Sequence, residues 1–229
     1  MKEIIDWTNQ NSGFLTLILF VSTLVLGWVS GIFRALMHKP KFQLEINEGP
    51  TFISSFPTEK EFNERKTHRT AAAIYLSVTN TGTAPAQIVS VRLGYHNYSF
   101  KYTFLWFWLN STPAIGDFGH TIGENLRVFP FLFQKNHLAA YSDSTYLQSG
   151  QHTIGVVYFE QPKSWGGFKP RVKNGQTKIK ILVKDSFGKR YAKTFAINVV
   201  KLEYARKFNS SFGNTLSLME EHPLEEWSQ

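Results

Sequence analysis

The sequence predicts an all-β protein in which an N-terminal transmembrane helix precedes an antiparallel β-sandwich with an aromatic-rich insertion. Three observations lead to this prediction. Residues 14–33 carry no charge, residues beyond Lys41 alternate between apolar and polar side chains, and turn-forming residues separate the alternating runs. The 229 residues include 42% hydrophobic side chains and no cysteine, which excludes a disordered chain, a disulfide scaffold and a cysteine-ligated metal site.

The uncharged run from Phe14 to Phe33 is long enough to span a membrane as a helix. At about 1.5 Å per residue it measures about 30 Å, the thickness of the hydrocarbon core of a bilayer. We therefore expect an N-terminal tail over residues 1–13 and a transmembrane helix over residues 14–36. A cleaved signal peptide is the alternative, but residues 1–13 carry two acids against one base instead of the usual basic region.

Basic residues near the span predict which side of the membrane holds the folded body. Lys2 precedes the span, whereas Arg34, Lys39 and Lys41 follow it. Because basic flanks tend to stay in the cytoplasm, we expect a single-pass protein of a bacterial inner (plasma) membrane with a cytoplasmic body. A periplasmic or extracellular body is the alternative.

Small side chains recur every four residues along the predicted helix, at Thr23, Gly27, Gly31 and Ala35. This spacing places them on one helix face, where two backbones can approach closely. The stripe predicts packing against a second helix, either in a homodimer or with another protein. The alternative is that glycine is simply frequent in transmembrane helices.

We predict a folded body over residues 37–210, because apolar and polar side chains alternate there with a period of two residues. The alternation occurs in five runs: residues 74–78, 89–93, 154–158, 179–183 and 195–199. Turn residues at 80–83 and 185–188 separate neighbouring runs, and several strands with few helical patterns indicate an antiparallel sandwich. Four glutamates near the C-terminus predict an acidic tail over residues 211–229.

The run from Ile74 to Ala86, followed by residues 88–93, resembles the B and C strands of bacterial immunoglobulin-like domains of the CARDB type. Leu147 to Gln151 is similar to a later turn of the same domains. The resemblance implies an immunoglobulin-like sandwich and a role in adhesion, scaffolding or partner binding. Many domains of this type lie outside the cytoplasm.

An insertion around residues 97–140 lengthens the body beyond a plain sandwich. Aromatic side chains occupy alternate positions from Tyr98 to Trp108, and Phe-Pro-Phe-Leu-Phe follows at residues 129–133. A strand that is apolar on both faces is buried on both or contacts a membrane. One hypothesis is an aromatic ridge that enters the bilayer interface, and the other is a second core layer between the sheet and the insertion.

Basic residues outnumber acidic ones by thirteen to two between Lys163 and Lys207. Among them, Lys178, Lys180 and Lys184 share the polar face of one predicted strand. Such a surface attracts anionic lipid, so we expect contact with the lipid bilayer. No aromatic residue interleaves with these three lysines, which argues against nucleic acid as a partner. An ordinary solvated basic face is the alternative.

No catalytic motif or metal-ligand spacing occurs in the sequence, so we expect no catalytic residue, no metal and no cofactor. Trp165 and Phe168 lie in a glycine-rich turn that forms a candidate contact loop, unless its tryptophan folds back onto the sandwich.

These observations together predict a membrane-anchored, non-enzymatic binding or adaptor module with an unidentified protein partner. One alternative is a membrane effector that assembles through its transmembrane helix, and another is an adhesive or binding module on the envelope side. An anchored enzyme is the alternative from a different class.

Overall fold

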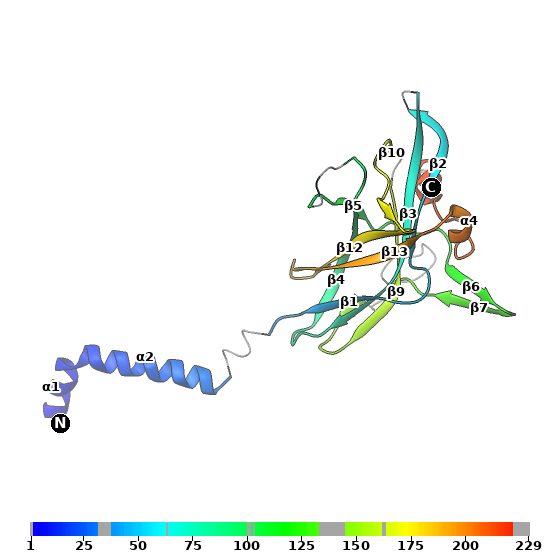
Figure 1. Ribbon diagram of the computed structural model, residues 1–229. Coiled ribbons are helices and arrows are strands. Elements are labelled where there is room, and N and C mark those ends of the chain that lie inside the picture. The colour runs from blue at the N-terminus through cyan, green and yellow to red at the C-terminus, as the bar shows by residue number, and fades with distance from the viewer. Residues whose placement is uncertain are drawn as a thin grey trace, which may run out of the picture. The chain divides into compact units, whose positions relative to one another are not determined.

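A computed structural model of the chain describes residues 2–31, 38–62, 64–99, 102, 104–132, 145–161 and 164–221. The chain forms two compact units, Met1–Lys39 and Pro40–Gln229. The first unit contains helices, and the second contains the β-strands and two short helices (Figure 1).

The N-terminal unit contains α1 (Lys2–Gln10) and α2 (Ser12–Val29). Most of the expected tail over residues 1–13 is thus the helix α1, which was not expected from the sequence. α2 has no buried residue and is long and apolar enough to cross a membrane. Its length, composition and position near the N-terminus fit a membrane anchor or a signal sequence.

The helix α2 ends at Val29, earlier than the predicted end at residue 36. Ser30 is its C-cap, and Gly31 follows with a φ angle of +77°, a left-handed conformation that glycine adopts without steric cost. The glycine therefore ends the helix. Residues 32–36 of the predicted span lie outside the described residues.

The second unit is mostly β, as predicted. It contains an eleven-stranded sheet and a separate two-stranded sheet. The elements are β1 (Phe42–Ile46), β2 (Phe52–Phe62), β3 (Arg65–Asn80), β4 (Ala86–Tyr95), β5 (Phe107–Asn110), β6 (Phe118–Ile122), β7 (Asn125–Phe129), β8 (Tyr146–Leu147), β9 (His152–Glu160), β10 (Ser164–Trp165), β11 (Val172–Lys173), β12 (Gln176–Asp185), β13 (Arg190–Val199), α4 (Leu202–Ala205) and α5 (Thr215–Glu221). The five predicted runs lie in β3, β4, β9, β12 and β13.

The long strand β3 is central to the larger sheet. One edge of β3 pairs with β9, and the other edge pairs with β2 and then β1, all antiparallel. A second group of antiparallel strands has the order β13-β12-β4-β5. The two groups join where β2 runs parallel to β13, with Phe52 opposite Asn198 and Ile53 opposite Val199. The expectation of a purely antiparallel arrangement was wrong at this junction, because the start of β2 and the end of β13 run in the same direction.

The main hydrophobic cluster draws on both groups of strands. It includes Ile74 and Leu76 of β3, Leu93 of β4, and Ile179 and Ile181 of β12, all with 0% exposure. Within each strand these residues occupy alternate positions, because successive side chains point to opposite faces. The period of two in the sequence is thus the period of core contacts.

A second hydrophobic cluster covers the opposite face of β3 and β9. Phe118 and Phe129, from the β6–β7 hairpin, and Phe212 pack there against residues that include Ala73 and Tyr158. This part of the aromatic-rich insertion forms a second core layer, as one of the two hypotheses predicted. Phe212 is only 1% exposed, so the start of the expected acidic tail packs onto the sheet, whereas residues 222–229 lie outside the described residues.

Candidate functional site

The outer face of β12 carries the three lysines that the sequence singled out. Lys178 and Lys184 are exposed and Lys180 is half-buried, whereas Ile179 and Ile181 point into the core. Because side chains alternate along a strand, all three lysines lie on one face, as the alternation predicted. Their contact with anionic lipid stays a prediction.

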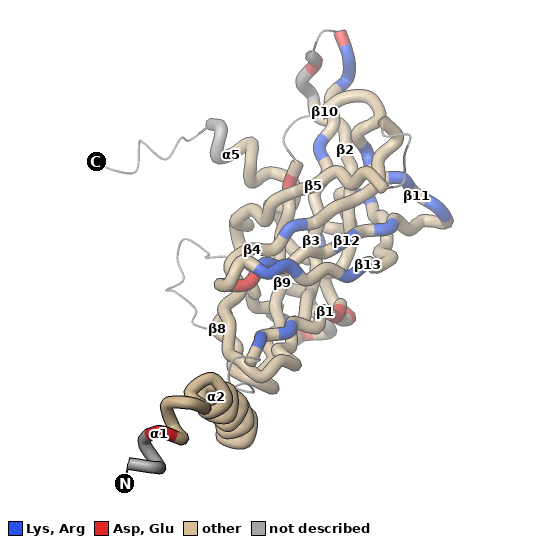
Figure 2. Tube along the Cα trace, turned by 90° about the vertical axis from the view of Figure 1, so that its left-hand side faces the viewer, with Lys and Arg blue, Asp and Glu red and all other residues tan. Residues whose placement is uncertain are grey.

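Neighbouring strands add two arginines to this face. Lys184 lies opposite Arg190 of β13, and Leu182 lies opposite Arg92 of β4. Figure 2 shows basic residues recurring along these strands. We call the surface formed with two adjacent tryptophans the basic-aromatic face, and its members are Arg92, Trp106, Trp108, Lys178, Lys180, Lys184 and Arg190.

The two tryptophan rings of the basic-aromatic face lie among its bases. The Arg92 guanidinium is 5.9 Å from the centroid of the Trp108 ring, and the Lys180 ammonium is 5.3 Å from that of Trp106. Each contact has the geometry of a cation–π interaction, which contributes about 0.5–1 kcal/mol at an exposed site. Bases and aromatic rings therefore alternate here, although the sequence suggested that these bases have no aromatic neighbours.

Gly94 explains how the Trp108 ring lies against β4. The register places Gly94 between Lys180 on one side and Trp108 on the other. A Cβ atom at this position would approach the indole to 3.0 Å, closer than ordinary contacts. The absence of a side chain thus makes room for the ring.

Further aromatic side chains are exposed in the segment that precedes β5. Tyr98, Tyr102 and Phe104 are 58%, 63% and 72% exposed, and the rings of Tyr102 and Phe104 stack with centroids 5.4 Å apart. This part of the insertion is the exposed aromatic surface that the ridge hypothesis requires, although no membrane contact is shown. Phe100, which belongs to the same alternating run, lies outside the described residues.

A hollow of about 460 Å³ opens on the same face. Arg92, Lys184 and Arg190 line it together with polar side chains from β4 and β5, including Ser90 and Asn110. Arg92 and Asn110 lie directly opposite each other on adjacent strands, which brings both to the hollow. Among the described residues, no acidic side chain lines it.

The predicted contact loop contains one exposed and one docked aromatic residue. Trp165 is 38% exposed at the end of β10. The Phe168 ring is half-buried, 5.8 Å from the Phe107 ring, and the Phe168 carbonyl accepts a hydrogen bond from Tyr95 Oη at 3.1 Å. Phe168 therefore folds back onto the body, whereas Trp165 stays accessible to a partner.

The helix stripe is shorter than predicted. Thr23 and Gly27 lie within α2, where the Thr23 hydroxyl donates to the Leu19 carbonyl at 2.7 Å. Gly31 lies beyond the end of the helix, and Ala35 lies outside the described residues. Two of the four stripe residues are thus on the described helix, and packing against a second helix stays a prediction.

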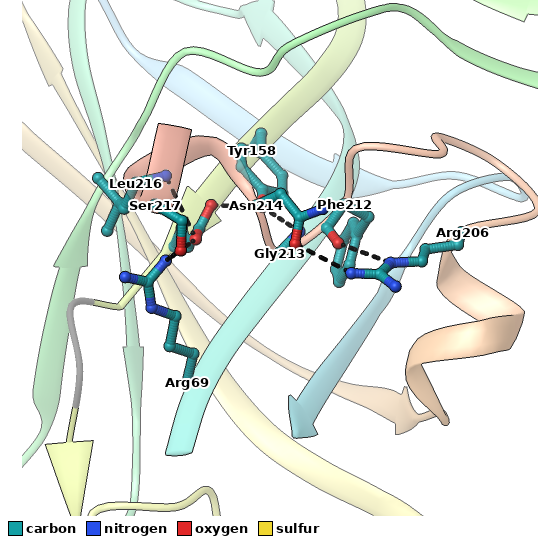
Figure 3. A network of polar contacts seen from close by, with 9 residues as sticks. Arg69, Tyr158, Arg206, Phe212, Gly213, Asn214, Leu216 and Ser217 are labelled. Atoms are coloured by element: carbon teal, nitrogen blue, oxygen red, sulfur yellow. Dashed lines mark hydrogen bonds and ion pairs between the residues drawn. The ribbon is translucent and has the colours of Figure 1, made fainter. Parts of the chain in front are cut away.

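A buried polar network joins β3 and β9 to the C-terminal segment (Figure 3). Arg69 Nη1 lies 3.3 Å from Glu160 Oε1 and donates to Ser217 Oγ at 2.6 Å. Tyr158 Oη donates to Glu160 Oε2 at 2.8 Å and accepts from the Gly213 N–H at 2.9 Å. The network therefore fastens residues 213–217 to the sheet.

Burial governs the chemistry of this network. The Arg69 and Glu160 side chains are 1% and 0% exposed. Burial raises the pKa of the Glu160 carboxyl above its usual value, and the Tyr158 hydroxyl and the Arg69 guanidinium oppose that rise. Because solvent does not reach the pair, its role is structural. No sequence pattern indicated this pair, because the two residues are 91 positions apart.

Among the described residues, no group of three or more histidine or acidic side chains could hold a metal ion. His68 is a buried histidine that forms no such group. Its side chain is 3% exposed, and its Nε2 has no hydrogen-bond partner within the described part of the chain. Burial, and secondarily the positive charge of Lys169, lower the pKa of His68 below its usual value of 6.5.

We expect the His68→Phe variant to show a flatter dependence of stability on pH. Because the folded pKa of His68 is lowered, the unfolded chain binds this proton more readily, and stability should fall as pH drops below about 6.5 toward the lowered pKa. Urea denaturation between about pH 7.5 and pH 5 measures this slope. Parallel profiles for the variant and the wild type would contradict the assignment.

The comparisons with known proteins leave the family of this chain open. The geometry defines a mostly β protein with an N-terminal apolar helix and an exposed basic-aromatic face. No protein-family model and no curated protein matches the chain. A crystal structure of a Bordetella pertussis protein provisionally named ApaA aligns over 70% of this chain and 94% of its own, with 10% identity and a TM-score of 0.28. At this TM-score the likeness supports no argument about fold or function.

Two arginines of the basic-aromatic face, Arg92 and Arg190, were not predicted to belong to it, although a sequence pattern indicated the position of each. Arg92 occupies a polar position between Val91 and Leu93, so its outward direction follows from the alternation. The predicted turn at residues 185–188 makes Lys184 and Arg190 neighbours across a hairpin. The tryptophans gave no comparable signal, because their place beside β4 depends on a pairing distant in sequence.

Proposed function

We propose that this protein is a membrane-anchored, non-enzymatic binding module whose immunoglobulin-like β-sandwich presents the basic-aromatic face to an anionic membrane surface. The helix α2 supports the anchor, since its length and composition suffice for a span. Two groups of strands that share one hydrophobic cluster support the sandwich. A cytoplasmic body and a relation to CARDB-type domains stay predictions.

The observation that carries this function is the placement of two partly exposed tryptophans among five bases. Indole rings favour the level of the lipid headgroups, because one part of the ring is apolar and the other donates a hydrogen bond. Lysine and arginine near an anionic membrane contribute about 1 kcal/mol each. Both contributions act at the same surface, so the face suits an anionic lipid interface.

Anchoring would also keep the body close to the membrane. Residues 30–41 connect α2 to β1, and a connection of this length reaches at most about 40 Å when fully extended. A tethered body thus meets the membrane far more often than a freely diffusing one. Modest attraction by the face is therefore sufficient to orient the body.

The test is flotation of the body, residues 40–229, with liposomes of increasing anionic lipid content. Replacing Lys178, Lys180 and Lys184 together by glutamine should weaken binding at least about tenfold, since three bases contribute up to about 3 kcal/mol. Replacing both Trp106 and Trp108 by serine should also weaken it, because the interfacial rings are lost.

A matched control removes the same charge elsewhere. Lys41, Lys66 and Lys201 are exposed and lie outside the basic-aromatic face, so their joint replacement by glutamine should change binding far less. Binding that does not respond to lipid charge, to salt or to the triple substitution at the face would contradict the proposal. In that case the face would be a docking site for an acidic protein or for nucleic acid, or a solvated surface.

A further inference from the structure

The hollow on the basic-aromatic face gathers cationic and polar side chains from four strands. Arg92 and Ser90 come from β4, Lys184 from β12 and Arg190 from β13. Asn110 at the end of β5 and Ser111 after it complete the polar lining. Every charged group that lines the hollow is a base.

The register places these bases at neighbouring positions on adjacent strands. Lys184 lies directly opposite Arg190, and Ser90 lies opposite Lys184 on the other side. Arg92 is two positions along β4 from Ser90, so it is a diagonal neighbour of Lys184. Like charges on opposite positions of adjacent strands destabilise a sheet, because their side chains repel each other.

No acidic side chain relieves this repulsion within the described part of the chain. The nearest acid in sequence, Asp185, is buried on the other face of β12. There its carboxylate accepts hydrogen bonds from the Tyr191 hydroxyl and from the Phe187 and Lys189 N–H groups. The three bases of the hollow therefore lack a counter-charge that a bound anion would supply.

We propose that this hollow binds the phosphate group of a phosphomonoester. Arginine presents paired N–H donors that match phosphate oxygens, lysine adds a compact charge, and the serine hydroxyls can each donate a further hydrogen bond. A phosphomonoester carries nearly two negative charges at neutral pH, so it gains more from three cations than a carboxylate does. The site deepens the proposed binding function, on which it rests, by naming the group that the face recognises.

Trp108 supplies a reporter for binding at this site. Its ring contacts the Arg92 guanidinium, with a cation-to-centroid distance of 5.9 Å. An anion that pairs with Arg92 should change the environment of the indole and therefore its fluorescence. The Trp108→Phe variant identifies how much of any change comes from this ring.

The experiment titrates the full chain in a non-ionic detergent, with calorimetry and tryptophan fluorescence as readouts. The probes are inorganic phosphate, a short-chain phosphatidic acid and acetate. We expect phosphate and phosphatidic acid to bind and acetate to bind at least about tenfold more weakly, with a fluorescence change that the Trp108→Phe variant loses.

Substitutions locate the site. Lys184→Gln and Arg190→Gln should each weaken phosphate binding at least about tenfold, whereas Lys193→Gln, on β13 but outside the hollow, should not. Lys184→Gln should also raise the melting temperature of the free protein, because it removes a repulsion. This readout shows that a loss of binding does not come from misfolding.

The two probes distinguish the source of the phosphate. Tighter binding of phosphatidic acid than of inorganic phosphate supports a lipid headgroup, and equal binding supports a soluble phosphate compound. Binding that is equal for acetate, or unchanged by both hollow substitutions, overturns the proposal. Because these titrations contain no liposomes, a failure here is separate from a failure of the flotation test.

Discussion

Replacing Gly155 by alanine is expected to lower the free energy of unfolding of the body by about 3–5 kcal/mol. Gly155 lies in β9, next to Val156, which forms a parallel bridge with Phe131 of a second chain segment. A Cβ atom there would clash with the Leu132 nitrogen and would lie 2.6 Å from the Phe131 carbonyl carbon. Both atoms are backbone, so no side-chain rotation can relieve the contact.

The size of this effect combines overpacking with lost hydrogen bonds. Overpacking a core costs about 1–3 kcal/mol. The Val156 N–H donates to the Pro130 carbonyl at 2.7 Å, and the Leu132 N–H donates to the Val156 carbonyl at 3.1 Å. Separating the segments weakens both bonds, each of which contributes about 1 kcal/mol. Because the free energy of unfolding of a domain is only about 5–15 kcal/mol, Gly155→Ala should remove much of the stability of the body.

Gly94→Ala is the matched control for this prediction. Its Cβ atom would meet the Trp108 side chain, at 3.0 Å, instead of backbone. Since a surface ring can move outward, we expect a loss of about 1 kcal/mol and a change in Trp108 fluorescence. Urea denaturation measures both variants, and similar losses for Gly94→Ala and Gly155→Ala would contradict the backbone contact.

The second large effect is expected at the buried pair of Arg69 and Glu160. Arg69→Met leaves the Glu160 carboxyl without its cation, and Glu160→Gln leaves the Arg69 guanidinium without its anion. Each single variant should lose about 3–5 kcal/mol, because an uncompensated charge stays buried. The double variant buries no charge, and a glutamine oxygen can still accept from the Tyr158 hydroxyl. We therefore expect the double variant to be more stable than either single one.

Hydrogen exchange provides a local measurement of the same network. The Gly213 N–H donates to Tyr158 Oη, and the Leu216 N–H donates to Glu160 Oε1 at 3.4 Å. Both amides should exchange faster in the single variants, as the C-terminal segment loosens from the sheet. The exposed Lys201→Gln should leave these rates and the stability unchanged. Additive losses in the double variant would show that the two charges do not interact.

The sequence by itself determined the features that depend on local periodicity. The uncharged run dictates an apolar helix. The end of this helix at Val29, before the predicted residue 36, became evident only from the left-handed φ angle of Gly31 in the structure. Alternation in the five runs dictates strands and decides which side chains face the core, because successive residues point to opposite faces. For this reason Lys178, Lys180 and Lys184 could be placed on one face before the structure was known.

Only the tertiary structure decided which strands are neighbours and therefore which side chains meet. The parallel pairing of β2 with β13, the docking of Trp108 on Gly94 and the junction of Arg69 with Glu160 all join residues distant in sequence. The tertiary structure also decided that one part of the aromatic insertion, around Phe118, is buried and that another part, around Phe104, is exposed. A local sequence pattern indicates which face of a strand a side chain occupies. Which residues that side chain contacts depends on the free energy of packing the whole chain. For this reason, the hollow between β4, β12 and β13 could not be predicted from the sequence and was found only in the tertiary structure.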